Sequence, residues 1–448
     1  MRMFGTNGIR GEANGYLSVE LALKVGKAIG KVLGPGPIAI AMDTRTSSEM
    51  IRSAVSAGLM SMGIDVHDLG MVPTPALQFY VKTHDVSGGV MITASHNPPE
   101  FNGIKCISSD GTECSHEEES AIEDAYDEDL KTVSWENIGR ETKVDGAGEA
   151  YVDAIVSMVD VDLIRRSDIK VVLDCANGAS VHTSPLLLER LGVHAVVLNG
   201  TPDGTFPGHY SEPVEENLSE LKEEVVRVGA DLGIAHDGDA DRCVFVSNTG
   251  TYLPGDIGLA LLSILCMKTT KGRKQVVSTV ALSNMVEDAI KEAGGTLVRT
   301  AVGSPVVARR MIEDGSPIGG EDNGGIIFAD MQYCRDGGLA AARMIEFVAR
   351  YGAIQEHVDS LPKYTTIKAA AYCPDDMKQA VVEGISKNHG TERIDRTDGL
   401  KIVFDDGWVL LRPSGTEPKF RIYSESKDPG IAKKRSEQFV GEVSDILG

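Results

Sequence analysis

Hydrophobic positions in this chain fall into short apolar runs separated by longer amphipathic stretches, and the arrangement repeats three times. In each copy, a strand-like run leads through a helical stretch and a glycine into a second strand-like run. Such runs, flanked by helices of this length, are typical of β-α-β units with a buried, mostly parallel sheet. The glycine after each helix fits a left-handed helix C-terminus. The paired strands are predicted at 38–43 and 64–70, at 171–174 and 193–199, and at 276–280 and 296–300.

The C-terminal part of the chain has a different pattern. From about residue 361, a strand-like run precedes a helix over 375–387. Three further strands follow at 400–404, 408–411 and 420–423, and a helix closes the chain. This order predicts an α+β domain, whereas the repeat, at about a hundred residues, is too long for a solenoid and predicts three separate α/β domains. The predicted domains are 1–147, 148–250, 251–361 and 362–448.

Composition narrows the class of protein. A chain of 448 residues is too long for one hydrophobic core, which supports several domains. A formal net charge of −22 argues against a nucleic acid or an anionic membrane as partner. The longest apolar run, 257–267, is too short to span a bilayer, and the first residues lack the apolar core of a signal peptide. Seven cysteines without C-x-x-C spacing favour reduced thiols. We therefore expect a soluble, cytoplasmic protein.

The first loop with candidate chemistry is Thr-Ala-Ser-His-Asn-Pro-Pro, residues 93–99, directly after the apolar run 89–92. In open α/β domains, ligands bind at loops that follow the carboxyl ends of strands. The two prolines stiffen the end of the loop, so that Ser95 and His96 are held in a fixed pose. Ser95 could carry a covalent group, or the loop could be a capped turn of ordinary turn residues. The loop alone does not distinguish these hypotheses.

The second loop, Asp237-Gly-Asp239-Ala-Asp241-Arg242, also follows an apolar run. Carboxylates at alternate positions converge if the loop curls, and they offer hard oxygen ligands to Mg²⁺ or Ca²⁺. An EF-hand is excluded, because its glycine position holds Arg242 and its bidentate glutamate position holds Asn248. We favour a metal loop over a solvated acidic turn. Waters or a phosphate oxygen would complete the shell of a Mg²⁺ ion.

The third loop, Gly-Gly-Glu-Asp-Asn-Gly-Gly at 319–325, lies between apolar runs. Its glycines permit tight turns, and Glu321, Asp322 and Asn323 can reach neighbouring sugar hydroxyls. Such glycine-rich turns are common, so this loop is weak evidence by itself.

The fourth loop, Arg-Pro-Ser-Gly-Thr-Glu-Pro-Lys-Phe-Arg at 412–421, offers a guanidinium, two hydroxyls and backbone N–H groups to a phosphate. It is not a Walker loop, because no Gly-Lys-Ser/Thr ends it. The loop is therefore a candidate phosphate site of another kind.

Together these loops resemble the α-D-phosphohexomutase superfamily, which includes phosphoglucomutase, phosphomannomutase and phosphoglucosamine mutase. A fifth motif, Phe-Gly-Thr-Asn-Gly-Ile-Arg-Gly at 4–11, precedes them, and all five stand in the family's order along the whole chain. The resemblance implies three similar mixed-sheet α/β domains and a C-terminal α+β domain around a central active-site cleft. Each domain is expected to contribute one loop.

The resemblance also implies a role for each motif, with Ser95 phosphorylated in the active form. The implied catalytic residues are Arg10, Ser95, His96, Lys105 and Arg242. The implied ligands of one Mg²⁺ per active site are Ser95, Asp237, Asp239 and Asp241. The implied substrate-binding residues are Glu321, Asn323, Arg412, Ser414, Gly415, Thr416 and Arg421.

Two departures from the family pattern bear on substrate and mechanism. The bacterial sugar loop often reads Gly-Glu-x-Ser-Gly-His, whereas here Asn323 replaces Ser and Gly325 replaces His. Ser304 stands where related sequences often have Asp. This form resembles archaeal members. The departures leave the preferred hexose and the general acid or base open.

The function implied by the resemblance is an intramolecular phosphotransferase that interconverts hexose 6-phosphate and hexose 1-phosphate through a sugar bisphosphate. We expect a phosphoglucosamine mutase, with phosphomannomutase or phosphoglucomutase as alternatives. The expected partners are therefore small hexose phosphates and bisphosphates, with no nucleic acid and no membrane, and the oligomeric state is undetermined.

Two hypotheses from other classes remain. A non-catalytic sugar-phosphate-binding protein could use the same fold, but Ser95 and the three aspartates count against it. A haloacid-type phosphatase could use an Asp-x-Asp nucleophile. Here, however, the aspartates lie in mid-chain and lack the Thr/Val pattern that follows in that group.

Overall fold

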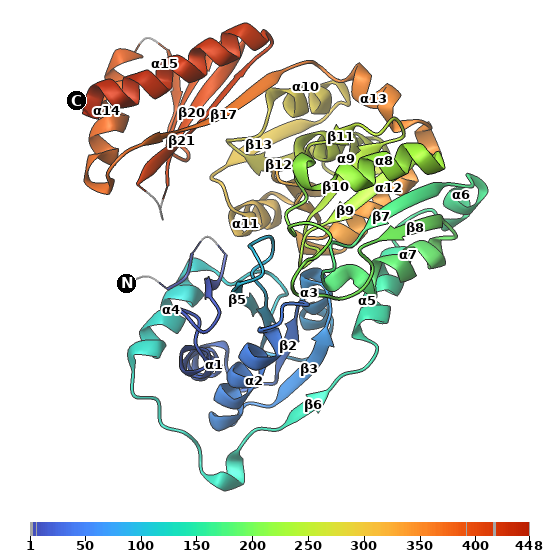
Figure 1. Cartoon of the computed structure of the whole chain (residues 1–448). Coiled ribbons are helices and arrows are strands. Elements are labelled where there is room, and N and C mark those ends of the chain that lie inside the picture. The colour runs from blue at the N-terminus through green and yellow to red at the C-terminus, as the bar shows by residue number, and fades with distance from the viewer. Residues whose placement is uncertain (1–2, 6, 391, 415–417, 448) are drawn as a thin grey trace.

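The computed structural model describes residues 3–5, 7–390, 392–414 and 418–447, so that Gly415 and Thr416 lie outside the described residues. Its described strands form four sheets, which define domains I to IV. In Figure 1, domain I lies at the bottom in blue, domain II at the right in green, domain III above them in yellow and orange, and domain IV at the upper left in red. The predicted fold class, three α/β domains followed by an α+β domain, is confirmed.

Domain I has a six-stranded sheet in the order β1-β5-β4-β2-β3-β6. The contacts from β6 to β4 are parallel, whereas β5 runs antiparallel to both β4 and β1. The strands are β1 (Ile9–Glu12), β2 (Ile38–Met42), β3 (Val66–Met71), β4 (Gly88–Ile92), β5 (Phe101–Ser108) and β6 (Glu141–Lys143). The helices are α1 (Val19–Leu33), α2 (Ser48–Ser61), α3 (Thr74–Thr83) and α4 (His116–Asp127). Ser18 and Ser115 cap α1 and α4 with their side chains, which explains where these helices begin.

Domain II has a five-stranded sheet in the order β11-β10-β9-β7-β8. Strand β7 is parallel to β8 and β9, and β10 is antiparallel to β9 and β11. The strands are β7 (Lys170–Asp174), β8 (His194–Leu198), β9 (Leu232–His236), β10 (Cys243–Ser247) and β11 (Tyr252–Leu253). The helices are α5 (Ala147–Val156), α6 (Val161–Arg166), α7 (Ser184–Leu191) and α8 (Ser219–Val228). Gly192 ends α7 in a left-handed conformation, as the pattern predicts.

Domain III repeats this plan with the sheet order β13-β12-β14-β15-β16. Strand β12 is parallel to β13 and β14, and β15 is antiparallel to β14 and β16. The strands are β12 (Gln275–Thr279), β13 (Thr296–Thr300), β14 (Ile318–Gly320), β15 (Ile326–Phe328) and β16 (Gln332–Arg335). The helices are α9 (Gly255–Thr269), α10 (Asn284–Glu292), α11 (Ser304–Asp314), α12 (Gly337–Tyr351) and α13 (Ile354–Ser360).

Domain IV has a wholly antiparallel sheet in the order β17-β21-β20-β19-β18. The strands are β17 (Thr365–Tyr372), β18 (Arg393–Asp395), β19 (Leu400–Phe404), β20 (Gly407–Pro413) and β21 (Lys419–Ser426). Helices α14 (Lys378–Asn388) and α15 (Pro429–Leu447) cover one face and pack on Val409, Leu411 and Ile422. On the opposite face, Trp408 and Leu410 contact domain III. The described chain also has four short 3-10 helices, at Trp135–Asn137, Ala179–Val181, Glu215–Asn217 and, within domain IV, Asp375–Met377.

The hydrophobic pattern predicts mostly parallel sheets, and it underestimates the antiparallel strands of the mixed sheets that the family resemblance implies. The paired strands of the three repeats are parallel, as predicted, but parallel and antiparallel contacts are equally frequent in the described sheets of domains II and III. Strands β5, β10 and β15 each follow their neighbour through a short loop, and a parallel pair needs a long crossover instead. These short loops, between β4 and β5, β9 and β10, and β14 and β15, are the ones that carry the predicted chemistry.

Among the described residues, no helix combines the length and the apolar character that a bilayer crossing requires.

Candidate active site

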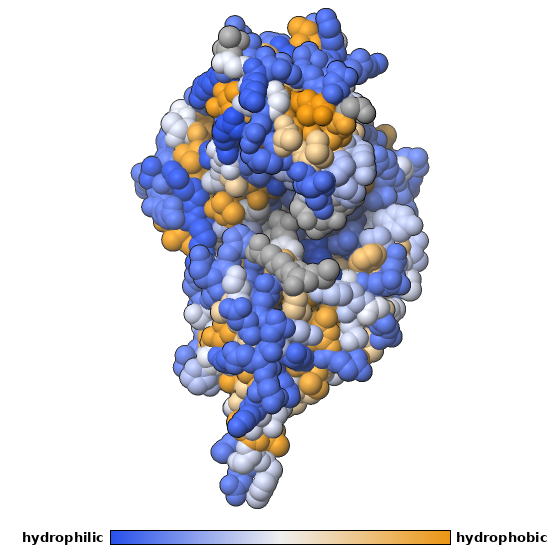
Figure 2. Space-filling view, turned by 90° about the vertical axis from the view of Figure 1, so that its left-hand side faces the viewer, coloured by the Kyte–Doolittle hydropathy of each residue, from blue (hydrophilic) through white to orange (hydrophobic). Residues whose placement is uncertain are grey.

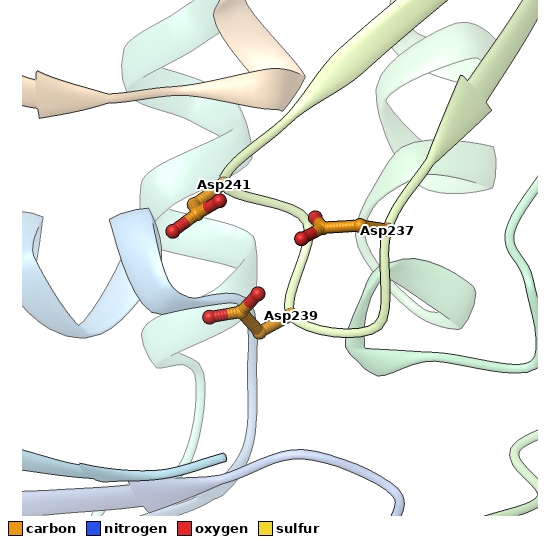
Figure 3. Close-up of side chains that lie close together, drawn as sticks. All are labelled: Asp237, Asp239 and Asp241. Carbon is orange, nitrogen blue, oxygen red and sulfur yellow. The ribbon is translucent and has the colours of Figure 1, made fainter. Parts of the chain in front are cut away.

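The three aspartates of the β9–β10 loop converge, as the sequence predicts. Asp237, Asp239 and Asp241 are buried, and each offers a ligand atom within 4.8 Å of the others. Figure 3 shows the three carboxylates gathered close together on one side of the loop. The loop reaches this curled shape with Ala240 in a left-handed conformation, at φ +54°. Carboxylates at alternate positions thus face one point.

The Ser95 loop lies directly against the aspartate loop. Ser95 Oγ donates a 2.7 Å hydrogen bond to Asp237 Oδ2. A Cβ at Gly238 would lie 2.5 Å from the carbonyl oxygen of Ser95, so only glycine permits this approach. Ser95 itself has φ +53°, a conformation that is strained for a serine. The structure therefore holds the hydroxyl in a costly pose beside the aspartates.

A buried ion pair beneath the Ser95 loop fixes that pose. Arg45 donates hydrogen bonds to the carbonyl oxygens of Ser95 (2.8 Å) and Phe101 (2.9 Å). Asp43 accepts hydrogen bonds from Thr93 Oγ1 (2.7 Å) and pairs with Arg45 at 3.0 Å. Sequence reasoning missed both charged residues. Both residues follow the carboxyl end of β2, next to the loop after β4. This position alone could have predicted a role at the site.

The aspartates have the electrostatics of a cation site. Burial, together with the neighbouring Asp239 and Asp241 carboxylates, raises the pKa of Asp237 to about 8. Burial alone would also raise the pKa of Asp239, but Lys105 lowers it below its ordinary range. Asp239 Oδ1 and Asp241 Oδ1 are buried and have no hydrogen-bond partner. A divalent cation would satisfy these oxygens and relieve the repulsion, so the residues fit Mg²⁺.

Four cationic side chains surround the cluster. Lys105 Nζ lies 2.6 Å from Asp239 Oδ2 and 3.1 Å from Asp241 Oδ2. Arg242 Nε lies 3.9 Å from Asp237 Oδ2, and Arg10 donates to Asn97 Oδ1 at 2.9 Å. The Nε groups of both arginines are buried without a hydrogen-bond partner. The fourth cation is Arg335, which ends β16 and lies 2.6 Å from Asp241 Oδ2. The unpaired donors suit a doubly charged anion such as a phosphoryl group.

His96 lies beside the reactive hydroxyl. Its Nδ1 is 3.4 Å from Ser95 Oγ. Burial, followed by the charges of Arg242 and Arg10, lowers the pKa of His96 to about 2. The imidazole is therefore neutral at physiological pH. It borders the same cavity as Arg242.

A cavity of about 750 Å³ receives side chains from all four domains. Its wall includes His96 of domain I, Arg242 of domain II, Asn323 of domain III and Arg421 of domain IV. Figure 2 shows a largely hydrophilic face that is hollowed at mid-height, between the upper and lower parts of the molecule. The expected central cleft, with a contribution from each domain, is thus present.

In the sugar loop between β14 and β15, some side chains line the cavity and others are buried in the protein. Asp322 and Asn323 line the cavity. Glu321 is 5% exposed and accepts a 3.1 Å hydrogen bond from the backbone N–H of Gly303. Burial raises the pKa of its carboxyl. Of the two predicted sugar ligands, only Asn323 lies on the described cavity wall.

The phosphate loop also separates its two arginines. Arg412 and Arg421 are directly opposite across β20 and β21. Arg421 lines the cavity, whereas Arg412 Nε lies 2.9 Å from Asp398 Oδ2. The backbone N–H of Ser414 donates to the carbonyl of Lys419 at 2.9 Å. The predicted residues Gly415 and Thr416 lie outside the described residues.

Besides Asp43 and Arg45, sequence reasoning missed two residues that touch the aspartate loop. Thr74 Oγ1 donates to Asp239 Oδ2 at 2.6 Å from the first turn of α3. Arg335 reaches Asp241 from the end of β16. Neither residue stands in a motif with recognisable chemistry, and only the packing of separate domains brings them to the loop.

Comparison with known proteins identifies the family. The chain matches the phosphoglucomutase/phosphomannomutase alpha/beta/alpha domains I, II and III at residues 1–132, 149–250 and 254–364, and the C-terminal domain at 370–442. The chain belongs to the phosphoglucomutase/phosphomannomutase family. The resemblance stated from the motifs is confirmed, and so is the prediction of a phosphohexomutase enzyme.

Relatives in this family are similar over their full length. A phosphoglucomutase/phosphomannomutase of Thermococcus kodakarensis is 42% identical, with 100% of this chain and 99% of the relative covered. A probable phosphoglucosamine mutase of Methanopyrus kandleri is 41% identical, with 99% and 98% covered. Among solved structures, a phosphoglucomutase/phosphomannomutase family protein of Burkholderia thailandensis is 25% identical with a TM-score of 0.88, and the match covers 99% of this chain and 97% of that chain.

Proposed function

We propose that this protein interconverts a hexose 6-phosphate and a hexose 1-phosphate through phosphorylated Ser95 and a sugar bisphosphate. The observation that carries the proposal is the contact between Ser95 Oγ and Asp237, beside two buried carboxylate oxygens that lack partners. A nucleophilic hydroxyl next to a cation site, and next to His96 on the wall of a cavity shared by four domains, suits phosphoryl transfer.

The chemistry follows from the charges around Ser95. In the first transfer, the bond between the Ser95 oxygen and phosphorus breaks, while a sugar hydroxyl forms a new bond to phosphorus and loses its proton. We assign Arg10 and Arg242 to the phosphoryl oxygens, because their buried Nε donors are unpaired. The neutral imidazole of His96 can take up a proton beside this centre, although its low pKa makes it a weak base. Mg²⁺ held by Ser95, Asp237, Asp239 and Asp241 would supply further charge neutralisation.

The second transfer requires the bisphosphate to present its other phosphate to Ser95. A site for the phosphate that does not react must therefore lie across the cavity from the serine. We assign this role chiefly to Arg421, which lines the cavity from domain IV, with Arg412 and Ser414 beside it. A guanidinium holds phosphate through directed, charge-assisted hydrogen bonds.

We further propose that the preferred substrate is glucosamine 6-phosphate. The wall of the cavity carries five carboxylates beside its cations Arg242, Lys363, Lys368 and Arg421, and we assign the carboxylates to the ammonium group of a hexosamine. These carboxylates belong to Glu212, Glu215, Glu216, Asp256 and Asp322. The Methanopyrus kandleri relative, named a probable phosphoglucosamine mutase, supports the same choice. The name of the Thermococcus kodakarensis relative instead favours glucose or mannose phosphates.

A coupled assay with the 6-phosphates of glucosamine, mannose and glucose tests both parts of the proposal. We expect turnover of at least one substrate with wild-type protein and none with Ser95→Ala. The highest kcat/KM should belong to glucosamine 6-phosphate. Binding of all three without turnover would favour the non-catalytic alternative, and a preference for glucose or mannose would refute the substrate assignment.

A further inference from the structure

Arg335 joins three domains through one buried guanidinium. Its side chain is 7% exposed. Nη2 lies 2.6 Å from Asp241 Oδ2 of domain II and 3.5 Å from Glu113 Oε1 of domain I. Nη1 lies 3.8 Å from Glu321 Oε2 of its own domain III. A single cation thus links the aspartate loop and the sugar loop to domain I.

The path of this side chain depends on a glycine in the sugar loop. A Cβ at Gly325 would lie 2.3 Å from Arg335 Cδ and 3.0 Å from its Cγ. These atoms belong to the stem of the side chain, so any residue larger than glycine would displace the guanidinium. Gly325 is one of the positions at which the sequence departs from the form that bacterial members of the family often have. The space that the departure leaves is filled by Arg335.

The second departure belongs to the same cluster. Ser304 Oγ donates a 2.7 Å hydrogen bond to Glu113 Oε2, and Asn7 donates to Glu113 Oε1. Glu113 therefore accepts hydrogen bonds from domains I and III and faces Arg335 as well. Ser304 and Gly325, which are separate changes along the sequence, meet at one guanidinium.

The contacts indicate what Arg335 does. It shares Asp241 Oδ2 with Lys105 and leaves Asp241 Oδ1 without a hydrogen-bond partner. On its other side it restrains Glu321, which precedes the cavity-lining Asp322 and Asn323. Arg335 is absent from the described wall of the cavity, so it acts through these neighbours.

We propose that Arg335 is a positioning residue that holds the aspartate loop and the sugar loop in register, and that Gly325 is the position that admits it. This inference rests on the proposed function, because the loops matter only if they bind a hexose phosphate. It predicts that Gly325 and Arg335 are coupled. Adding a methyl group at 325 should be much less harmful without Arg335, since the remaining close contact is 3.1 Å to Asn323 Oδ1.

A double-mutant cycle tests this coupling with Gly325→Ala, Arg335→Ala and the combined variant. The dissociation constant of glucosamine 6-phosphate would be measured by calorimetry in EDTA, followed by KM and kcat with Mg²⁺ and by the melting temperature. Each single change should weaken binding about tenfold, because a displaced sugar loop holds the substrate less well. The combined variant should bind within about twofold of Arg335→Ala, because the two closest contacts of the new methyl group, both to Arg335, are then gone. Gly441→Ala and Arg343→Ala are matched controls at residues absent from the described wall of the cavity, and both should bind like wild type.

The outcomes separate positioning from a merely structural role. A lower melting temperature with unchanged dissociation constant and KM in the folded Arg335→Ala variant would overturn the inference. So would single penalties that simply add in the combined variant. If Arg335→Ala does not fold, Gly325→Ala and Arg335→Lys decide, because both keep the positive charge but displace it. Wild-type protein that neither binds nor converts any hexose phosphate would overturn the proposed function itself, and the inference with it.

Discussion

Domains I to III differ from domain IV in how their hydrophobic cores connect them. One hydrophobic cluster runs continuously through the first three domains and includes Leu77, Leu188 and Phe347. Domain IV has a core of its own, and it meets domain III in a small cluster around Trp408 and Val280. The reacting groups therefore lie within a shared interior, whereas the proposed phosphate anchor belongs to a separately packed body.

The two regions also differ in how their charges are paired. Around Ser95, carboxylates and cations are buried and hold one another at hydrogen-bond distance. In domain IV, Lys368 Nζ forms an ion pair with Asp322 Oδ2 of domain III at 2.9 Å, and the lysine side chain is 60% exposed. Buried partners fix geometry, while exposed pairs contribute little to stability. We therefore expect changes in the first region to act on kcat and changes in the second to act on KM.

The largest effect is expected for Ser95→Ala. Loss of the nucleophile should lower kcat by at least ~10³-fold, since its removal eliminates the covalent route. The fold should remain, because Arg45 holds the loop through backbone carbonyls. Steady-state kinetics and a thermal melt check both points. Ser211→Ala, a buried serine that contacts the same loop, is the control and should keep most activity. Near wild-type turnover by Ser95→Ala would remove this residue from the mechanism.

Metal removal should have the next largest effect. Chelation with EDTA should abolish turnover, and Mg²⁺ should restore it, because three buried carboxylates otherwise repel one another. Mg²⁺ should also raise the melting temperature of the wild-type protein by roughly a few degrees, since it binds only the folded state. Asp239→Asn should lose most of that shift. Full activity after exhaustive chelation would contradict the metal assignment.

The arginines of domain IV sharpen the comparison. Arg421→Ala should raise KM about tenfold to a hundredfold, the cost of a lost hydrogen bond to a charged group, while kcat changes little. Arg412→Ala should raise KM less, because Arg412 forms an ion pair with Asp398 and is absent from the described wall of the cavity. A Lys at position 421 should rescue only partly, since it lacks the planar fork. A fall in kcat alone, with unchanged KM, would show that Arg421 is not the anchor.

The smallest expected effect concerns pH and substrate choice. Burial and the nearby Asp322 raise the pKa of Asp256 to about 6. Above that pH the carboxylate is ionised and can attract a hexosamine ammonium group; below it the carboxyl is neutral. The ratio of kcat/KM for glucosamine 6-phosphate to that for glucose 6-phosphate should therefore rise severalfold, roughly the effect of one partly screened charge pair, between pH 5 and 7. In Asp256→Asn the ratio should be lower and independent of pH, and an unchanged profile would exclude this residue from substrate choice.

Much of the fold could be predicted from short-range patterns. Strands β2 and β3 were predicted because alternating or continuous apolar runs flank a helix that ends near Gly63. Strand β18 was not predicted, because it is short and polar. The directions of β10 and β15 were also missed, since apolar composition is the same in parallel and antiparallel strands. Only the shortness of the preceding loop distinguishes them.

The site was predictable where one loop carries several chemical groups. Asp237, Asp239 and Asp241 stand close in the sequence, and their convergence follows from the spacing. Arg335 and Glu113 could not be found in this way, because they act through contacts between domains. Nor could the sequence decide between Arg412 and Arg421. The assignment of the phosphate anchor depends on the tertiary structure, in which Arg421 lines the cavity and Arg412 pairs with Asp398.

Because the site loops are hairpin loops, their residues can differ between related enzymes without a change in the sheet. The loop at 321–325 is closed at its base by the pairing of Gly320 with Ile326, so its content can vary while the sheet keeps its order. The residues of this loop can therefore be exchanged without a change in strand pairing. Gly325 is the exception, because it lies against Arg335 in a later strand. If this loop were replaced by the loop of a relative with a histidine at position 325, Arg335 would have to be replaced by the residue of that relative as well. If the proposed coupling holds, a change of substrate preference through this loop involves positions 325 and 335 together.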